Sequence, residues 1–237
     1  IQIGNEITNG CLWEVCKLTG EGSPREGYDS LAAILKAGIR AVREKSRAEI
    51  VLHLENSGNN PLWREWFDEI TARDVDFDII GASYYPFWHG SFSNLKKNLD
   101  DMAERYKKDI MIVETAYAFT NEPYKTKKGE IELVIRGDMK LSDGSEPPYP
   151  LTKEGQVSFV RDLLSLAGTI KGMKGVYYWE PAWLPLKGST WATAAARRYM
   201  DEEYKAGGNE WANQCIFDYG GNATPALNEF KRANFGY

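Results

Sequence analysis

The sequence predicts an α/β protein of the (β/α)8 TIM barrel class. Short apolar runs, typical of strands covered on both faces, alternate with longer runs of helical periodicity. Segments that lead from a helix to the next strand are short, whereas several that follow a strand are long, at roughly residues 8–27, 117–150 and 183–223. Barrels build their active face from the connections after the strands. A doubly wound sheet is the alternative, but no glycine-rich nucleotide-binding motif follows any strand.

Five βα units follow one another along the chain. In the first, apolar residues three or four positions apart, among them Leu31, Leu35 and Ile39, predict a helix. In the second, Asn60 is expected to cap the helix and Pro61 to occupy its first turn. The expected strands cover residues 1–7, 49–56, 77–88, 109–117 and 175–183, and the expected helices cover 28–46, 61–74, 94–108, 152–170 and 225–234.

Five strands cannot close an eight-stranded barrel. Residues 1–237 are therefore expected to be the C-terminal part of a single catalytic domain, supplying strands four to eight. The N-terminal βα units, about three in number, would lie upstream of Ile1. Because open sheet edges invite pairing, we expect either that absent N-terminal segment or a second chain to complete the barrel.

Composition disfavours two classes of partner. A net charge of −5 and an isoelectric point near 5.3 argue against nucleic acid, because its binders concentrate Lys and Arg. The apolar runs fall short of the roughly 20 residues that cross a bilayer, so no membrane partner is expected. Eight Trp and thirteen Tyr, many of them in expected loops, favour a carbohydrate partner, although long loops also pack aromatic rings.

Two carboxylates are expected at strand ends, where barrel enzymes hold their catalytic groups. Glu6 ends the first expected strand and Glu114 ends the fourth. A glycosidase needs two carboxyl groups beside one bond, one protonated to assist departure and one ionised to attack or stabilise the anomeric carbon. A strand-end glutamate can also form only a salt bridge or a helix cap, so position alone does not decide its role.

Five stretches in order carry a resemblance to a known family: IQIGNEITNGCLW, HLENSG, DIIGASYYPFWHG, MIVETAY and GVYYWEPAW. Together they resemble the endo-β-1,4-galactanases of glycoside hydrolase family 53, which are retaining enzymes with a (β/α)8 barrel. The resemblance implies that Glu6 is the acid/base, that Glu114 is the nucleophile and that no cofactor is required. This sequence departs from the family's HLDNG motif, because Glu55 replaces the shorter Asp.

Four polar or aromatic residues near strand ends are candidates for binding sugar. By the resemblance, Asn5 hydrogen-bonds the sugar 2-hydroxyl, although an Asn can also simply cap the backbone. Trp179 is similar to the platform under the sugar at the cleavage point, with a core Trp as the alternative. Trp88 and Trp183 are expected as outer platforms, and loop packing is the alternative for both.

Two tyrosines and two histidines complete the expected site. Strand alternation allows only one of Tyr84 and Tyr85 to reach Glu114, where its hydroxyl would keep the carboxylate ionised, while the other packs. His53 and His89, at expected strand ends, either bond sugar hydroxyls or order the carboxylates. Two histidines without a ligand-spaced partner do not predict a zinc site.

Calcium and a fixed disulfide are not predicted. Some bacterial members of the similar family carry an acidic calcium loop after strand seven, whereas residues 118–130 here contain few ligands and several Lys. We therefore expect no metal at that loop. Cys11, Cys16 and Cys215 allow one disulfide at most, either Cys11–Cys16 or a bridge to Cys215, and the sequence does not decide between them.

The sequence therefore predicts a retaining endo-glycosidase that hydrolyses β-1,4-galactan, the side chain of pectic arabinogalactan. A β-mannanase or β-xylanase of the same clan is the alternative enzyme. A non-catalytic carbohydrate-binding remnant is the alternative of another class. A polysaccharide substrate implies a secreted, periplasmic or cell-surface protein, although no signal segment is visible in the sequence.

Overall fold

The computed structural model describes residues 1–13, 15–18, 26–126, 129–130, 133–142, 144–186, 189, 193–199 and 209–233. Its centre is a parallel sheet in which strands that are consecutive in sequence lie side by side. The strands are, in order, β3 (Val51–Leu54), β4 (Ile79–Tyr84), β5 (Asp109–Thr115) and β8 (Met173–Val176). Gln2 adds a parallel bridge to Val51. This order, with a helix in each crossover, is that of a (β/α)8 barrel, so the predicted fold class is confirmed.

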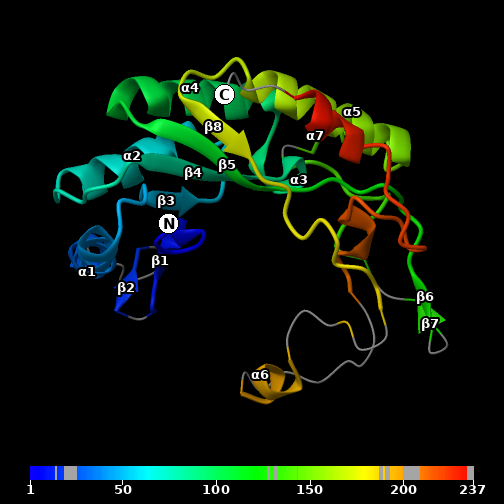
Figure 1. Cartoon of the computed structure of the whole chain (residues 1–237), viewed down its shortest axis with the longest axis horizontal. Coiled ribbons are helices and arrows are strands. Elements are labelled where there is room, and N and C mark those ends of the chain that lie inside the picture. The colour runs from blue at the N-terminus through cyan, green and yellow to red at the C-terminus, as the bar shows by residue number, and fades with distance from the viewer. Residues whose placement is uncertain are drawn as a thin grey trace.

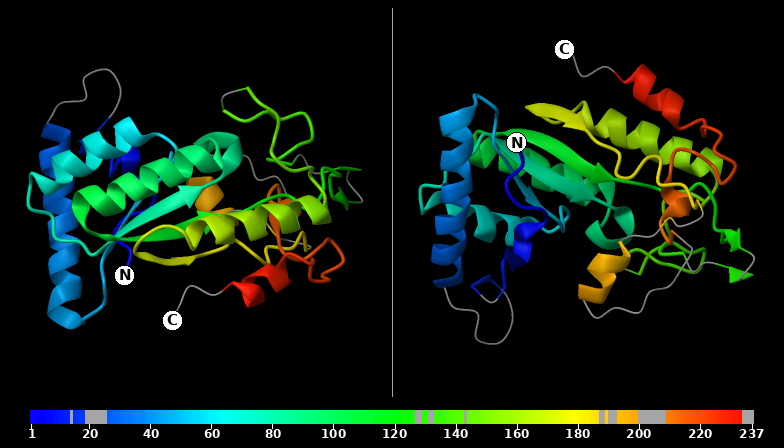
Figure 2. Two further views of the ribbon diagram at one scale, coloured as in Figure 1. Left: turned by 90° about the horizontal axis from the view of Figure 1, so that it is seen from above. Right: turned by 60° about the horizontal axis from the view of Figure 1, so that its bottom comes forward.

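Helices form a layer along one side of the sheet (Figures 1 and 2). The helices of this layer are α1 (Glu26–Lys45), α2 (Asn60–Thr71), α4 (Phe92–Tyr106), α5 (Lys153–Ala167) and α7 (Leu227–Arg232), and each contacts the next in this order. Their apolar sides bury large rings against the strands, including Trp63, Trp66 and Phe159. Full burial of a Phe side chain contributes about 1.5–3 kcal/mol, and the larger Trp rings bury still more apolar area. None of the described helices is long and apolar enough to span a lipid bilayer.

Shorter elements occupy the connections that follow the strands. They are η1 (Ile7–Asn9), β1 (Gly10–Cys11), β2 (Cys16–Lys17), α3 (Pro86–His89), β6 (Lys125–Thr126), β7 (Gly129–Glu130), α6 (Ala194–Tyr199) and η2 (Ala212–Gln214). In Figure 1 the β6–β7 hairpin and the helix α6 lie away from the sheet. The long connections therefore gather beyond the carboxyl ends of β5 and β8, where a barrel carries its site.

The first expected strand differs from the structure. Residues 1–7 keep only the bridge at Gln2, supported by hydrogen bonds between Val51 and its neighbours Ile1 and Ile3. Glu6 has a left-handed backbone with φ of 49°, which cannot continue a strand. The prediction that Glu6 ends a strand is therefore wrong in detail, because the chain turns into η1 immediately after it.

Further boundaries also differ from the prediction. The expected strand 77–88 ends at Tyr84 and is followed by the helix α3, so His89 ends a helix and not a strand. Asn59, not Asn60, caps α2, because the side chain of Asn59 accepts the free backbone donor in the first turn. Pro61 does lie in that turn, as predicted. The last strand ends at Val176, so Trp179 lies beyond it and not at its end.

Candidate active site

Alternation along the strands determines which side chains face away from the helices. Leu52 on β3, Ile80 on β4 and Ile112 on β5 pack into the core shared with the helices. On each strand the neighbours of these residues therefore face the opposite side of the sheet. His53 on β3 and Ser83 on β4 belong to that opposite set. The two side chains meet across the strands, with His53 Nε2 and Ser83 Oγ 2.8 Å apart.

A bulge on β5 brings Glu114 to the same place. Ala82 pairs with Ile112, but the next residue, Ser83, pairs with Glu114, so Val113 is an extra residue on β5. Without the bulge, Glu114 would share the helix-facing side of Ile112. The bulge instead lets the carboxyl turn toward the histidine and serine.

Glu6 reaches this point from the N-terminal segment. Carboxyl oxygens of Glu6 and Glu114 lie within 4.8 Å of one another. Glu6 holds a left-handed backbone (φ 49°, ψ 53°), which costs a residue with a side chain about 1–2 kcal/mol. The segment that follows Glu6 is held by α2, because the Trp66 indole donates to the Ile7 carbonyl at 3.1 Å. Backbone strain maintained in this way is a common feature of functional sites.

A chain of hydrogen bonds runs from Gln2 through His53 and Ser83 to Glu6. The Gln2 amide can only donate to His53 Nδ1 (3.1 Å), so Nε2 carries the imidazole proton and donates to Ser83 Oγ. The Ser83 hydroxyl then donates to Glu6 Oε1 at 2.5 Å. Burial lowers the pKa of His53 to about 4, so the imidazole is neutral, as this chain requires.

The environment of Glu114 raises its affinity for a proton. Burial, followed by the charge of Glu6, raises the pKa of Glu114 to about 7. The Tyr85 hydroxyl opposes this shift, because it donates to Glu114 Oε2 at 3.0 Å and favours the ionised form. The two carboxyl groups thus share an environment in which simultaneous ionisation is costly.

Tyr84 points away from the carboxylates. Its hydroxyl donates to the Gly90 carbonyl at 3.0 Å, and its ring lies 5.5 Å from Phe92 and 6.3 Å from Phe159. Only 1% of Tyr84 is exposed. The two tyrosines therefore divide as strand alternation predicts, with Tyr85 at the carboxylate and Tyr84 in the core.

Glu55, which replaces a shorter residue of the family motif, holds the segment after Glu6. Its carboxylate accepts the Thr8 hydroxyl at 2.6 Å, and its backbone carbonyl accepts the Trp63 indole at 2.9 Å. Burial raises the pKa of Glu55, while the bond from Thr8 opposes that shift. The longer side chain thus bridges β3 to η1, next to the two carboxyl groups.

Aromatic side chains form a continuous row beside the carboxylates. Trp211 lies 5.0 Å from Trp179, 6.1 Å from Trp88 and 6.2 Å from Tyr85 between ring centroids. Trp183 extends the row, 6.0 Å from Trp179. Trp88 is 39% exposed, so part of this row is open to a ligand.

Asn5 and His89 border the same region. Asn5 is exposed, and its side-chain oxygen accepts the Gln2 amide at 3.2 Å. His89 is buried, with Nδ1 2.9 Å from the Ser83 carbonyl. Burial lowers the pKa of His89 to about 4, so this imidazole is also neutral. Its ring stands edge-on to Tyr85, 5.7 Å away between centroids.

Among the residues that the structure describes, one cluster has the composition of a metal site. Glu6, His53 and Glu114 each offer a ligand atom, and these atoms lie within 4.8 Å of one another. Coordination requires a free imidazole lone pair. Here His53 Nδ1 accepts from Gln2, while Nε2 carries the proton that binds Ser83. The hydrogen bonds of the imidazole therefore do not suit a metal.

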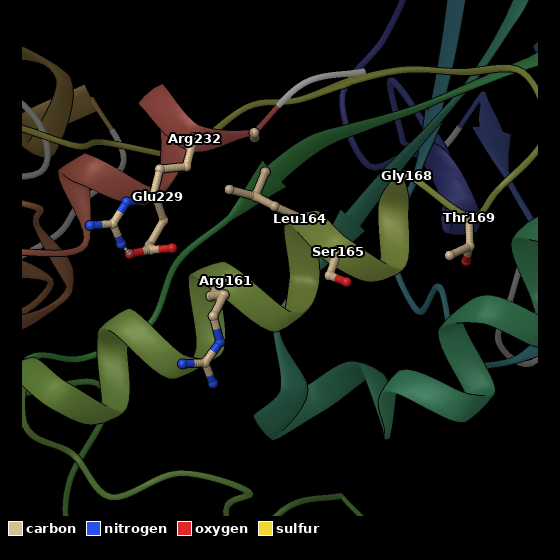
Figure 3. A pocket seen from close by; sticks show the side chains of 8 residues that line it. Arg161, Leu164, Ser165, Gly168, Thr169, Glu229 and Arg232 are labelled. Atoms are coloured by element: carbon tan, nitrogen blue, oxygen red, sulfur yellow. Dashed lines mark hydrogen bonds and ion pairs between the residues drawn. The ribbon is translucent and has the colours of Figure 1, made fainter. Parts of the chain in front are cut away.

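The hollows in the described part of the chain include two that lie in different regions of the structure. One, about 300 Å³ in volume, is lined by Asn56, Asn59, Trp88, His89 and Asn94 with other residues, and so adjoins the aromatic row. The other, about 330 Å³, lies between α5 and α7 (Figure 3). That second hollow belongs to the outer helix layer and contains neither carboxyl group of the pair.

The site lies within a stretch that matches one known family. The family model for glycosyl hydrolase family 53 matches residues 1–230, which include both carboxylates and the aromatic row. The chain belongs to glycosyl hydrolase family 53. The resemblance read from the five sequence motifs is therefore confirmed.

Relatives from several organisms match nearly the whole chain. The chain is 33% identical over 256 residues to an endo-β-1,4-galactanase of Bacillus subtilis, covering all of this chain and 55% of that protein. It is 31% identical over 241 residues to an arabinogalactan endo-β-1,4-galactanase of Cellvibrio japonicus, covering 98% and 56%. The solved family-53 catalytic domain of Ignisphaera aggregans is 29% identical, with a TM-score of 0.75, over 97% of this chain and 57% of that one. The chain thus spans just over half the length of these relatives.

Several residues of the family-53 site were not found from the sequence. Ser83 and Gln2 carry the hydrogen bonds to Glu6 and His53, but a strand serine and a terminal glutamine carry no distinctive pattern. Trp211 joins the predicted tryptophans, and its signal was only that of one more aromatic residue in a long loop. Thr8, whose hydroxyl binds Glu55, was also not predicted, because a threonine two positions after Glu6 forms no distinctive motif.

Proposed function

We propose that the protein containing this chain is a retaining endo-glycosidase that hydrolyses β-1,4-galactan. Family membership supports a glycosidase, and the substrate is taken from the names of the Bacillus subtilis and Cellvibrio japonicus relatives. The observation that carries the mechanism is the pair Glu6 and Glu114, whose oxygens lie within 4.8 Å. Retaining pairs are about 5–5.5 Å apart, whereas inverting pairs keep about 6.5–9.5 Å to admit a water.

In this proposal the two carboxyl groups have different tasks. Glu6 protonates the glycosidic oxygen while Glu114 attacks the anomeric carbon and forms a glycosyl-enzyme. Glu6 then removes a proton from water, which releases the sugar with its original configuration. Tyr85 supports Glu114 as the nucleophile, because its hydroxyl favours the ionised carboxylate. Ser83 orients Glu6 through its 2.5 Å bond.

Aromatic faces are proposed to bind the galactan chain. Trp179 is proposed as the platform at the cleavage point, with Trp211 and Trp88 continuing the surface and Trp183 at its other end. Sugar rings stack on such faces because apolar C–H surface is buried with little loss of rotamer entropy. The exposure of Trp88 and the adjoining 300 Å³ hollow support a path for the galactan chain that passes over Trp88.

Polar contacts are proposed from fewer residues. Asn5 is exposed beside the carboxylates and is proposed to bind the sugar 2-hydroxyl. His53 is proposed to order Glu6 and not to bind sugar, since both of its ring nitrogens are occupied. Tyr84 is left out of the proposed contacts because it is in the core. His89 is proposed to position Tyr85, against which it packs.

No cofactor takes part in the proposed reaction, because the two carboxyl groups supply both proton transfer and nucleophile. We also propose that the protein acts outside the cytoplasm, being secreted, periplasmic or at the cell surface. The support is the polymeric substrate named for the relatives, which is too large to enter a cell intact.

The test is proton NMR of the first product released from galactan. A β-anomer that appears before mutarotation supports the proposal, and an initial α-anomer contradicts retention. Parallel assays on galactan, mannan and xylan at equal concentration test the substrate. Faster cleavage of mannan or xylan would show that the protein is a mannanase or a xylanase. Binding to galactan without turnover would show that it is a non-catalytic carbohydrate-binding protein.

A further inference from the structure

The β1–β2 hairpin places two of the three cysteines opposite each other. Cys11 and Cys16 are partners in its antiparallel register. Directly opposed residues in such a pair have Cα atoms about 4.5–5.5 Å apart, and a disulfide accepts about 4.4–6.8 Å. A backbone bond from Leu18 to Asn9 (3.1 Å) holds the register at the open end. The hairpin can therefore accept a disulfide without rearrangement of its backbone.

The three thiols differ in their surroundings. Cys16 is fully buried in the core, whereas Cys11 is half-buried and packs against that core. Burial and the hydrogen-bonding neighbour Cys16 both raise the pKa of Cys11. Cys215 lies after η2, and its thiol donates to the Trp183 carbonyl at 3.2 Å. Cys11 is thus more accessible to solvent than Cys16. Cys215 is bound to the Trp183 carbonyl instead of to either of these thiols.

We propose that Cys11 and Cys16 form a reversible disulfide that closes the hairpin under oxidising conditions. With oxidised glutathione as the oxidant, the Cys11 thiolate attacks one glutathione sulfur, the glutathione S–S bond breaks and one glutathione thiolate leaves. The Cys16 thiolate then attacks Cys11 Sγ and releases the second glutathione thiolate. Two protein thiols are oxidised, one glutathione disulfide is reduced, and the two protons end on the two glutathione thiols.

The disulfide would fix the segment that carries Glu6. That segment is held at one end by the Thr8–Glu55 bond and continues directly into the hairpin. Closing a loop of about six residues removes enough entropy from the open hairpin to lower its population more than tenfold. Reduction, by attack on the accessible Cys11 sulfur, would restore the open population.

The test uses the folded chain treated with oxidised or reduced glutathione, then alkylated in denaturant and weighed by mass spectrometry. The oxidised protein should be lighter by two hydrogens before alkylation and should expose one alkylatable thiol, Cys215. The reduced protein should expose all three. Peptide mapping should find Cys11 joined to Cys16, and amide exchange across residues 10–17 should slow more than tenfold on oxidation.

Matched variants separate this disulfide from other outcomes. Cys215→Ser should still lose two hydrogens on oxidation, whereas Cys11→Ser should not, and its buried Cys16 should take no glutathione. If Cys16→Ser folds, Cys11 should hold glutathione as a stable mixed disulfide. Three free thiols after oxidation, a bridge to Cys215, or a lasting glutathione adduct on wild-type Cys11 would each overturn the proposal.

Discussion

Replacing Tyr85 by Phe should move the acid limb of the pH–rate profile to higher pH. The hydroxyl of Tyr85 donates to Glu114 at 3.0 Å and favours its ionised form. Removing that donor raises the pKa of Glu114 further above its ordinary value. If Glu114 is the nucleophile, it must be ionised to react, so a larger fraction of the enzyme is inactive at any acidic pH.

The size of the shift follows from the strength of the lost bond. A hydrogen bond to a charged group contributes about 1.5–3 kcal/mol, and one pKa unit corresponds to about 1.36 kcal/mol. Because Glu114 is only partly buried, the lower value applies and the shift is about one unit. Since the pKa of Glu114 is already about 7, kcat/KM at pH 6 should fall about tenfold. At pH 9 the loss should be small.

The assay is kcat/KM on soluble galactan between pH 4 and pH 9. Tyr84→Phe is the matched control, because it removes an equally buried hydroxyl that donates to the Gly90 carbonyl and not to a carboxylate. It should cost about 1 kcal/mol of stability and leave the acid limb in place. An unshifted limb in a folded Tyr85→Phe enzyme, or a shift to lower pH, would refute the assigned role of the hydroxyl.

Two further predictions concern the same region. Ser83→Ala removes the donor to Glu6 and should lower kcat/KM on galactan about tenfold, while sparing aryl glycosides whose leaving groups need no proton; equal losses on both substrates would contradict a role through the acid. The second concerns acid stability, because burial lowers the pKa of His53 and His89 to about 4. Between pH 6.5 and 4 the unfolded chain binds protons that these folded imidazoles do not, so each should cost up to about 3 kcal/mol of stability on acidification. Because the pKa of Glu114 is raised in the folded protein, acidification from pH 7 to 4.5 stabilises the fold through this group and offsets the loss from one histidine. Urea unfolding should therefore show a net loss of stability near that of one histidine, and Glu114→Gln should make the loss larger. A Glu114→Gln protein that loses no more stability than wild type would contradict this.

The strand order and the helix layer could be predicted because local patterns specify them. Apolar runs mark β3, β4 and β5, and helical periodicity marks α1, α2, α4 and α5 within a few residues. The strand at residues 1–7 could not be excluded, because its apolar alternation is real. What ends it is the left-handed backbone at Glu6, which the sequence does not reveal for a residue other than Gly or Asn.

The site could be predicted only in part, because its geometry depends on contacts between distant segments. Strand ends and the family resemblance pointed to Glu6 and Glu114. The bulge at Val113, which aims Glu114, arises from pairing with β4 and has no local signature. Trp211 joins the aromatic row because the long connection that carries it folds back beside Trp179. The course of such a connection cannot be predicted from its residue types.

The most direct test of the central claim uses azide with Glu6→Ala and a dinitrophenyl β-galactobioside. This substrate needs no acid to form the glycosyl-enzyme on Glu114, and azide can then attack that intermediate in place of water. Two inversions at the anomeric carbon should give a β-glycosyl azide. Glu114→Ala should instead give the α-azide, because azide enters the space of the missing nucleophile. β-Azide from Glu114→Ala together with α-azide from Glu6→Ala would show that the acid/base and the nucleophile are assigned the wrong way round.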